Sequence, residues 1–187
     1  MTSFTREELE RFVDATVDDL VGDDVRLVVV GINPGLWTAA TNTHFAHPSN
    51  RFYPALRRAG IADREIPSTG MDDDDRAHLL SRGLAITNIV ARATVKASDL
   101  TTAELREGAV ALERRIAAWG PAVVAVAGVT AYRTAFRRPK AVLGEQDETL
   151  GGARLWVVPN PSGLNAHETV DSLADWYAAP ARAAGVI

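Results

Sequence analysis

Short runs of β-branched and other apolar residues recur along the chain, and a segment with helical signals lies between one run and the next. Such mostly apolar runs are typical of strands buried on both faces of a parallel sheet. The runs occupy 25–30, 85–90, 122–127 and 154–158. The helical segments occupy 5–20, 50–59, 72–82, 101–119, 130–137 and 168–177. This alternation predicts an α/β fold, a three-layer α/β/α arrangement around a central, mostly parallel sheet.

The chain is expected to form one domain. A chain of 187 residues can bury about 70% of its extended surface in a single core. Thr5 with Glu8, and Thr101 with Glu104, have the spacing of capping boxes and mark two helix starts. We expect residues 1–187 to be a single domain, with an N-terminal helical extension over 1–22 and a loose tail over 179–187. Residues 36–50 are expected to be an irregular loop.

Composition excludes several kinds of chemistry. The chain has no cysteine, which removes thiol catalysis, iron–sulfur clusters and cysteine-ligated zinc. Its four histidines are scattered, so we expect neither a metal site nor a cofactor. The net charge of −4 provides no overall basic field for nucleic acid. Because no apolar run is long enough for a membrane span and the N-terminus lacks a signal-peptide core, we expect a cytoplasmic protein with no membrane partner.

Two loops rich in glycine, proline and asparagine each follow a predicted strand. The first begins with Gly31-Ile-Asn-Pro-Gly35, and the second is Asn160-Pro-Ser-Gly-Leu-Asn165. The carboxyl ends of parallel strands meet at one edge of a sheet, so both loops can face the crevice where such sheets bind ligands. Either loop alone is typical of an ordinary chain reversal.

Four segments taken together, in order and spacing, resemble one family. They are Gly31-Ile-Asn-Pro-Gly-Leu36, His44-Phe-Ala-His-Pro-Ser-Asn-Arg-Phe52, Thr87-Asn-Ile-Val-Ala-Arg-Ala-Thr94 with its continuation over 98–108, and Asn160-Pro-Ser-Gly-Leu164. The family is the mismatch-specific uracil-DNA and thymine-DNA glycosylases, family 2 of the uracil-DNA glycosylase superfamily. The resemblance covers residues 25–177 and implies the superfamily's fold.

The resemblance implies a monofunctional DNA glycosylase that initiates base excision repair. Such an enzyme flips uracil out of mismatched G·U DNA, where extrusion costs least, and hydrolyses the N-glycosidic bond. Asn33 would position the attacking water, since an amide orients water but is no base near neutral pH. A general base is typically worth about 10²–10⁴-fold, so we expect slower chemistry than in relatives with Asp at this position.

The resemblance also implies four base-binding residues. Phe45 would stack on the flipped base, and backbone N–H groups near Ile32 and Phe45 would bind its carbonyl oxygens. The β-branch of Thr38 would crowd a thymine methyl group, which favours uracil. Asn88 stands where bacterial mismatch-specific members can have Lys, and its amide would contact the base or the water and broaden activity beyond G·U pairs.

The second loop and one arginine are implied to contact DNA. Leu164 would enter the base stack as an apolar wedge. Backbone groups of Gly163 and Asn165 would pair with the widowed guanine, while Ala166 replaces an arginine that would strengthen this contact. Arg51 would meet a phosphate. The full DNA-binding set is Arg51, Asn160, Ser162, Gly163, Leu164 and Asn165.

Two alternatives stay open from the sequence. One is a superfamily glycosylase that prefers another base, such as hypoxanthine, xanthine or ethenocytosine. The other is a non-catalytic DNA-binding module of the same fold. An unrelated nucleotide-binding protein is disfavoured because the chain has no Walker or GxGxxG glycine pattern. The expected partner is double-stranded DNA that contains uracil or a mismatch, and we expect a monomer. Its expected localisation is cytoplasmic, of bacterial type, with association to the nucleoid while it acts on DNA.

Overall fold

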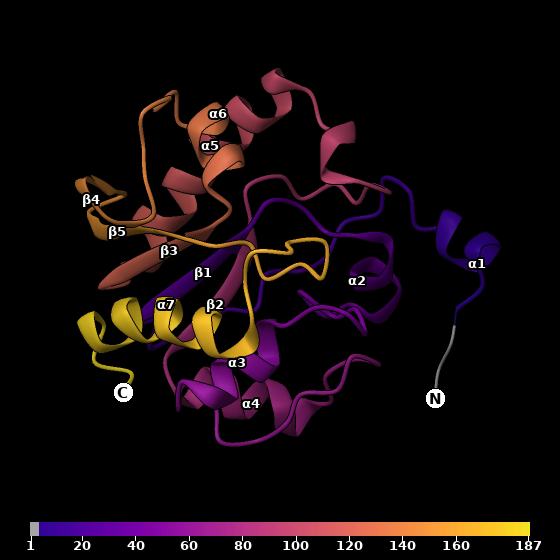
Figure 1. Cartoon of the computed structure of the whole chain (residues 1–187), viewed down its shortest axis with the longest axis horizontal. Helices are drawn as coiled ribbons and strands as arrows, with labels where there is room; N and C mark the ends of the chain where they lie inside the picture. Colours follow the sequence, from indigo (N-terminus) through magenta and orange to yellow (C-terminus); the bar gives the residue numbers. More distant parts are fainter. Residues whose placement is uncertain (1–3) are drawn as a thin grey trace.

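A five-stranded sheet forms the centre of the computed structural model, which describes residues 4–187 (Figure 1). Its strand order is β2-β1-β3-β5-β4. The strands are β1 (Leu27–Gly31), β2 (Leu84–Asn88), β3 (Val123–Ala127), β4 (Gly144–Leu150) and β5 (Ala153–Val158). The first four of this order run parallel, and β4 is antiparallel to β5. The expected mostly parallel sheet is therefore confirmed.

Helices cover both faces of the sheet, as Figure 1 shows. One face carries α5 (Thr102–Trp119) and α6 (Val129–Ala135); the other carries α3 (Phe52–Arg58), α4 (Asp73–Ser81) and α7 (Val170–Ala183). Leu27 and Val29 of β1 belong to the core on the second face, whereas Val28 and Val30 belong to the core on the first. Each central strand is thus buried on both sides, which explains its mostly apolar run.

The N-terminal segment differs most from the sequence-based expectation. Helix α1 covers only Arg6–Glu10, although Thr5 and Glu8 do form the predicted capping box. Asp14 has a φ of 66°, and the chain beyond it is extended rather than helical. Leu20 exchanges two backbone hydrogen bonds with Ile86, of 2.8 and 2.9 Å. The apolar residues that suggested a longer helix therefore pack this segment along β2; the first three residues of the expected extension lie outside the described part.

Three further segments correct the expectations. Residues 36–50 include a short helix, α2 (Leu36–Thr41). The edge strand β4 was not predicted, because its polar sequence has no apolar run. Helix α7 continues to Ala183, and Ala181 and Val186 are buried, so the C-terminal residues are packed and not a loose tail. No helix within residues 4–187 combines the length and apolar character that crossing a membrane requires.

The sheet has a topological switch point between β1 and β3. From β1 the chain moves outward to β2, and from β2 it returns through α5 to β3 on the other side of β1. Open α/β sheets bind ligands outside the carboxyl ends of the strands at such a point. The loops that follow β1, β2, β3 and β5 are therefore the place to look for a site.

Candidate active site

The two loops singled out from the sequence meet at the carboxyl edge of the sheet. Gly128, directly after β3, has no side chain, and the space beside it is taken by Ile32 and Asn160. A Cβ atom on Gly128 would lie 3.4 Å from Cδ1 of Ile32 and 3.7 Å from Nδ2 of Asn160. Backbone hydrogen bonds from Val90 to Ile32 and from Thr94 to Pro34 attach the loop after β2. The site is therefore assembled from four strand ends.

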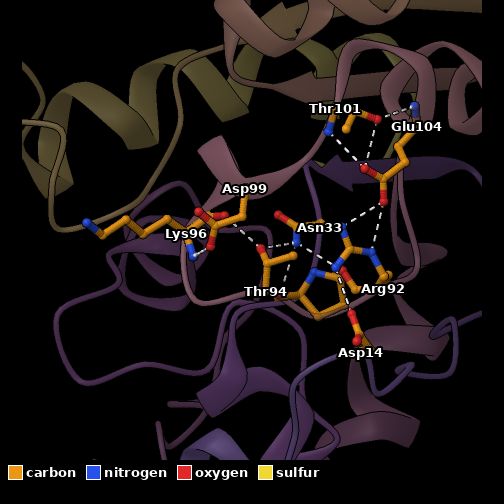
Figure 2. Close-up of polar contacts among 9 residues, drawn as sticks. Asp14, Asn33, Arg92, Thr94, Lys96, Asp99, Thr101 and Glu104 are labelled. Carbon is orange, nitrogen blue, oxygen red and sulfur yellow. Dashed lines mark hydrogen bonds and ion pairs between the residues drawn. The ribbon is translucent and has the colours of Figure 1, made fainter.

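The amide of Asn33 is held in one orientation. Its Nδ2 donates to Oγ1 of Thr94 (2.7 Å) and to the carbonyls of Arg92 (3.0 Å) and Pro34 (3.2 Å) (Figure 2). Carbonyl oxygens only accept, and the Thr94 hydroxyl already donates to the Lys96 carbonyl at 2.8 Å. The nitrogen must therefore face these three acceptors. The Oδ1 atom has no hydrogen-bond donor among residues 4–187, so it remains a free acceptor for a water molecule.

Ion pairs fix the loop that orients Asn33. Arg92 pairs with Asp14 at 2.7 Å and with Glu104 at 2.7 Å, as Figure 2 shows. The backbone N–H of Thr101, then Arg92 and the Thr101 hydroxyl, lower the pKa of Glu104 to about 2. Glu104 is thus ionised across the neutral range; it completes the capping box of α5, whose N-cap is Thr101, and it pairs with Arg92. The main chain at Arg92 is held between the N-terminal segment and α5.

Phe45 and Asn88 converge over Gly31, the last residue of β1. A Cβ atom on Gly31 would collide with Oδ1 of Asn88 and would lie 3.1 Å from Cζ of Phe45. The Phe45 ring lies 4.1 Å from the Phe52 ring, at a tilt of 32°, and is half-buried. The structure therefore brings together an aromatic surface and an amide oxygen beside the strand end that carries Asn33.

Sequence reasoning gave His44 no clear role, and the structure gives it one. Its Nε2 lies 2.9 Å from the Asp18 carbonyl, which only accepts, so Nε2 carries the hydrogen. Nδ1 is then an acceptor, and it receives a hydrogen bond from Nδ2 of Asn88 at 3.0 Å. Burial lowers the pKa of His44, which keeps it neutral. His44 thereby orients the Asn88 amide with its oxygen toward Gly31; no local sequence signal indicates this.

The remaining base-binding candidates lie around the same edge. Thr38 is buried within α2. The backbone N–H groups of Ile32 and Phe45 donate to no other group within the described part of the chain. Phe45 has a φ of 58°, an uncommon conformation for a non-glycine residue. These two N–H groups are available to a carbonyl oxygen of a ligand.

The loop between β5 and α7 is tied together by its own polar groups. The Ser162 N–H donates to Oδ1 of Asn160 (3.0 Å), and Nδ2 of Asn165 donates to the Asn160 carbonyl (3.0 Å). Gly163 packs against Ser49 so closely that a Cβ atom would lie 2.5 Å from the Ser49 hydroxyl. Leu164 stands at the tip with 94% of its surface exposed.

The structure places two DNA-binding candidates differently from the expectation. Arg51 does not extend into solvent: its guanidinium donates to carbonyls of the loop after β5. The N–H of Asn165 donates to the Ser162 carbonyl, and the Asn165 carbonyl accepts from Arg51. The Asn165 N–H is therefore not free for a guanine, and its carbonyl has only one lone pair left. Of Gly163 and Asn165, the two residues expected to contact the guanine, only Gly163 has backbone groups that are unpaired within the described residues.

Comparison with known proteins agrees with this arrangement. Residues 19–181 match the family model described as the Uracil DNA glycosylase superfamily. Among solved structures, the chain is similar to the solution NMR structure of a "putative Uracil DNA glycosylase" from Methanosarcina acetivorans. The TM-score is 0.62 at 12% sequence identity, over 91% of this chain and 98% of that one. At this identity the likeness concerns the fold.

Proposed function

The chain belongs to the uracil DNA glycosylase superfamily, and from that premise we propose that it is a monofunctional DNA glycosylase that excises uracil from G·U mismatches in double-stranded DNA. The observation that carries the proposal is the amide of Asn33, whose nitrogen is fully engaged and whose oxygen receives no hydrogen bond from residues 4–187. Such a group can accept a hydrogen bond from water and aim the water's lone pair at a sugar carbon. It cannot remove a proton near neutral pH.

The leaving base is stabilised by groups that are already in place. In the proposed reaction, water attacks C1′, the N-glycosidic bond breaks, and the base leaves with the bonding electrons; the proton that the water loses passes to the departing base anion. The free N–H groups of Ile32 and Phe45 would donate to the carbonyl oxygen on which the negative charge grows. No general acid is required for an anionic leaving group, and the reaction needs no metal or organic cofactor.

Base selection follows from the orientation of Asn88. Its oxygen faces the space over Gly31 and would accept a hydrogen bond from N3–H of uracil. Cytosine carries an unprotonated acceptor at N3, so it would oppose this oxygen. Phe45 would stack on either base, and Thr38 would crowd a 5-methyl group. Uracil is therefore the base that fits all three side chains.

The duplex is opened by Leu164 in this proposal. A fully exposed leucine on a well-bonded loop is suited to enter a base stack, as apolar wedges do in other DNA-bending proteins. The Gly163 backbone would contact the widowed guanine. Because the Asn165 backbone is engaged and residue 166 is alanine, few groups are left to read that guanine, so we expect moderate discrimination between G·U and A·U pairs by a monomer on DNA.

The test is single-turnover base excision with enzyme in excess. Substrates are duplexes with G·U, A·U, G·T or G·hypoxanthine pairs and a single strand with uracil. We expect uracil release, fastest from G·U, and a loss of at least about tenfold in Asn33→Ala, because the attacking water is then no longer held in position. Preferred release of hypoxanthine would instead support a glycosylase of this superfamily that prefers a base other than uracil. DNA binding with no release of any base would leave a non-catalytic module.

A further inference from the structure

Arg51 is bonded to the loop after β5 at four points. Its backbone N–H donates to the Pro161 carbonyl at 3.0 Å. Its side-chain Nη2 donates to the carbonyls of Ser162 and Asn165, both at 2.6 Å, and Nη1 donates to the Glu168 carbonyl. The four acceptors are spread over residues 161–168 of the loop between β5 and α7. One residue therefore holds both ends of the turn that carries Leu164.

The charge of Arg51 has only carbonyl dipoles as partners. No carboxylate pairs with it among residues 4–187, and its Nε is buried without a hydrogen-bond acceptor. A partly buried cation needs polar groups that replace the hydration it loses, and three main-chain carbonyls do so here. Both hydrogens of Nη2 and one of Nη1 are taken by these carbonyls, so a phosphate would meet a guanidinium whose donors are mostly in use. The planar guanidinium of arginine can donate in several fixed directions at once, whereas the charge and donors of lysine lie on a single nitrogen atom.

The other side of the same turn is held by contact. Gly163 lies against Ser49: a Cβ atom added to Gly163 would lie 2.6 Å from the Ser49 carbonyl oxygen. The Ser49 hydroxyl in turn forms a hydrogen bond with Nδ1 of His47 at 2.9 Å. The loop is thus fixed between residues 47–51 and its own internal hydrogen bonds. Leu164 is the large apolar side chain that this loop exposes, at 94% of its surface. A side chain that is presented in a fixed position enters a partner without the entropic cost of ordering its loop.

We propose that Arg51 is a positioning residue for wedge insertion. It holds residues 161–168 in the shape that presents Leu164 to the duplex, and it makes no phosphate contact. This inference rests on the proposed function, because it assigns Leu164 the task of opening the base pair. It goes beyond that function by naming the group that keeps the wedge ready before DNA arrives.

The first test is a double-mutant cycle on excision from a G·U duplex. Arg51→Gln should slow excision by at least about tenfold, to the level of Leu164→Ala, and the double variant should be no slower than Leu164→Ala alone. Uracil placed opposite an abasic site needs little wedge action, and its release should be nearly unaffected. Arg57→Gln is the matched control, since Arg57 lies on α3 with an exposed side chain and should leave all rates unchanged.

The salt dependence of DNA binding separates positioning from phosphate contact. A phosphate contact contributes about one unit to the slope of log affinity against log salt concentration. Arg51→Gln should leave this slope unchanged. A slope that falls by about one, with effects of Arg51→Gln and Leu164→Ala that multiply, would overturn the proposal and restore a phosphate contact.

Hydrogen exchange tests the clamp in the free protein, without any activity. In Arg51→Lys, which keeps the charge but loses the fork, the amides of Ser162, Leu164 and Asn165 should exchange at least about tenfold faster, while β1 and β3 amides stay protected. Unchanged loop exchange would refute the clamp even if excision falls. If the parent releases no base from any substrate, the proposed function fails instead, and the exchange data still decide whether Arg51 holds the loop.

Discussion

An amide at position 33 satisfies three neighbours that a carboxylate would oppose. Two are carbonyl oxygens and the third is a hydroxyl whose hydrogen is already donated to the Lys96 carbonyl. An ionised aspartate in place of Asn33 would turn one oxygen toward these acceptors, so the site would raise its pKa and keep it protonated. A protonated carboxyl is no general base. The three acceptors around position 33 therefore favour asparagine over an ionised aspartate.

From this we predict that Asn33→Asp does not gain the rate that a general base normally adds. We expect excision at pH 7 to be slower than in the parent by about tenfold or more, because the aspartate is either protonated or turned out of position. The measurement is the single-turnover rate on G·U DNA from pH 6 to 9. Faster excision than the parent at neutral pH would show that the three acceptors do not control this side chain.

At His44 a buried neutral ring makes stability depend on pH. Burial lowers the pKa of His44 below its ordinary value of 6.5, so the unfolded state binds a proton before the folded state does. Stability from this group is therefore complete above pH 6.5 and is lost as the pH falls below it toward the lowered folded-state pKa.

We predict that His44→Gln flattens this part of the pH profile. Glutamine offers both a donor and an acceptor, so contacts to Asp18 and Asn88 can be retained without titration. The free energy of urea unfolding, measured at pH 7.5, 6.5 and 5.5, should fall across this range more steeply in the parent than in the variant. Parallel profiles for the two proteins would mean that another group titrates there.

At the scale of elements, burial on both faces made the central strands predictable. Short, mostly apolar runs are typical of the interior of a sheet, and β1, β2, β3 and β5 lie within about two residues of their expected ranges. The edge strand β4 follows no such pattern, because one face and one edge meet solvent. The helix expected over 5–20 failed because apolar residues at 17 and 20 serve an extended segment equally well.

The candidate site shows the same division. Asn33, Phe45, Asn88 and Leu164 were predicted because they stand in segments that resemble a known family. The structure brings Phe45 and Asn88 together over Gly31 and bonds Asn33 to the loop after β2. The positions of Arg51 and His44 depend on carbonyls far away in the sequence, at Ser162 and Asp18. Main-chain acceptors carry no sequence signature, so such contacts become visible only in three dimensions.

Helix α5 approaches the end of β2 so closely that one position in it must lack a side chain. A Cβ atom on Gly108 would lie 2.5 Å from the Ile89 carbonyl. Replacing glycine by alanine inside a helix normally stabilises a protein by about 0.5–1 kcal/mol. Here we predict that Gly108→Ala destabilises by about 1–3 kcal/mol, because the helix must move away from the sheet.

The measurement is urea unfolding of Gly108→Ala beside Glu107→Ala. Glu107 is exposed on the same helix, so its substitution should change the unfolding free energy by no more than about 0.5 kcal/mol. Because Ile89 begins the loop that leads to Arg92 and Thr94, excision by Gly108→Ala should also slow. A stabilised Gly108→Ala would contradict the close approach.

At the scale of the whole molecule, both oriented amides depend on the segment before β1. The Asp14 carboxylate holds Arg92, whose carbonyl orients Asn33. The Asp18 carbonyl fixes His44, which orients Asn88. In the same segment the side chains of Val17 and Leu20 are buried, and Asp19 pairs with Arg115 at 2.9 Å. Residues 14–20 are therefore a structural part of the site and not an appendage to it.

Two truncations test this assignment. Removal of residues 1–12 takes away α1 and the Phe4–Trp37 ring contact, so the unfolding free energy should fall by about 1 kcal/mol and excision should persist. Removal of residues 1–20 also takes away two buried apolar side chains and the Arg115 pair, which should cost about 5 kcal/mol or more and leave little folded protein. Leu20→Ala, expected to cost about 2–5 kcal/mol, keeps the comparison measurable by urea unfolding if the longer truncation is insoluble. Retention of full stability and excision without residues 1–20 would show that the sheet orients Asn33 and Asn88 unaided.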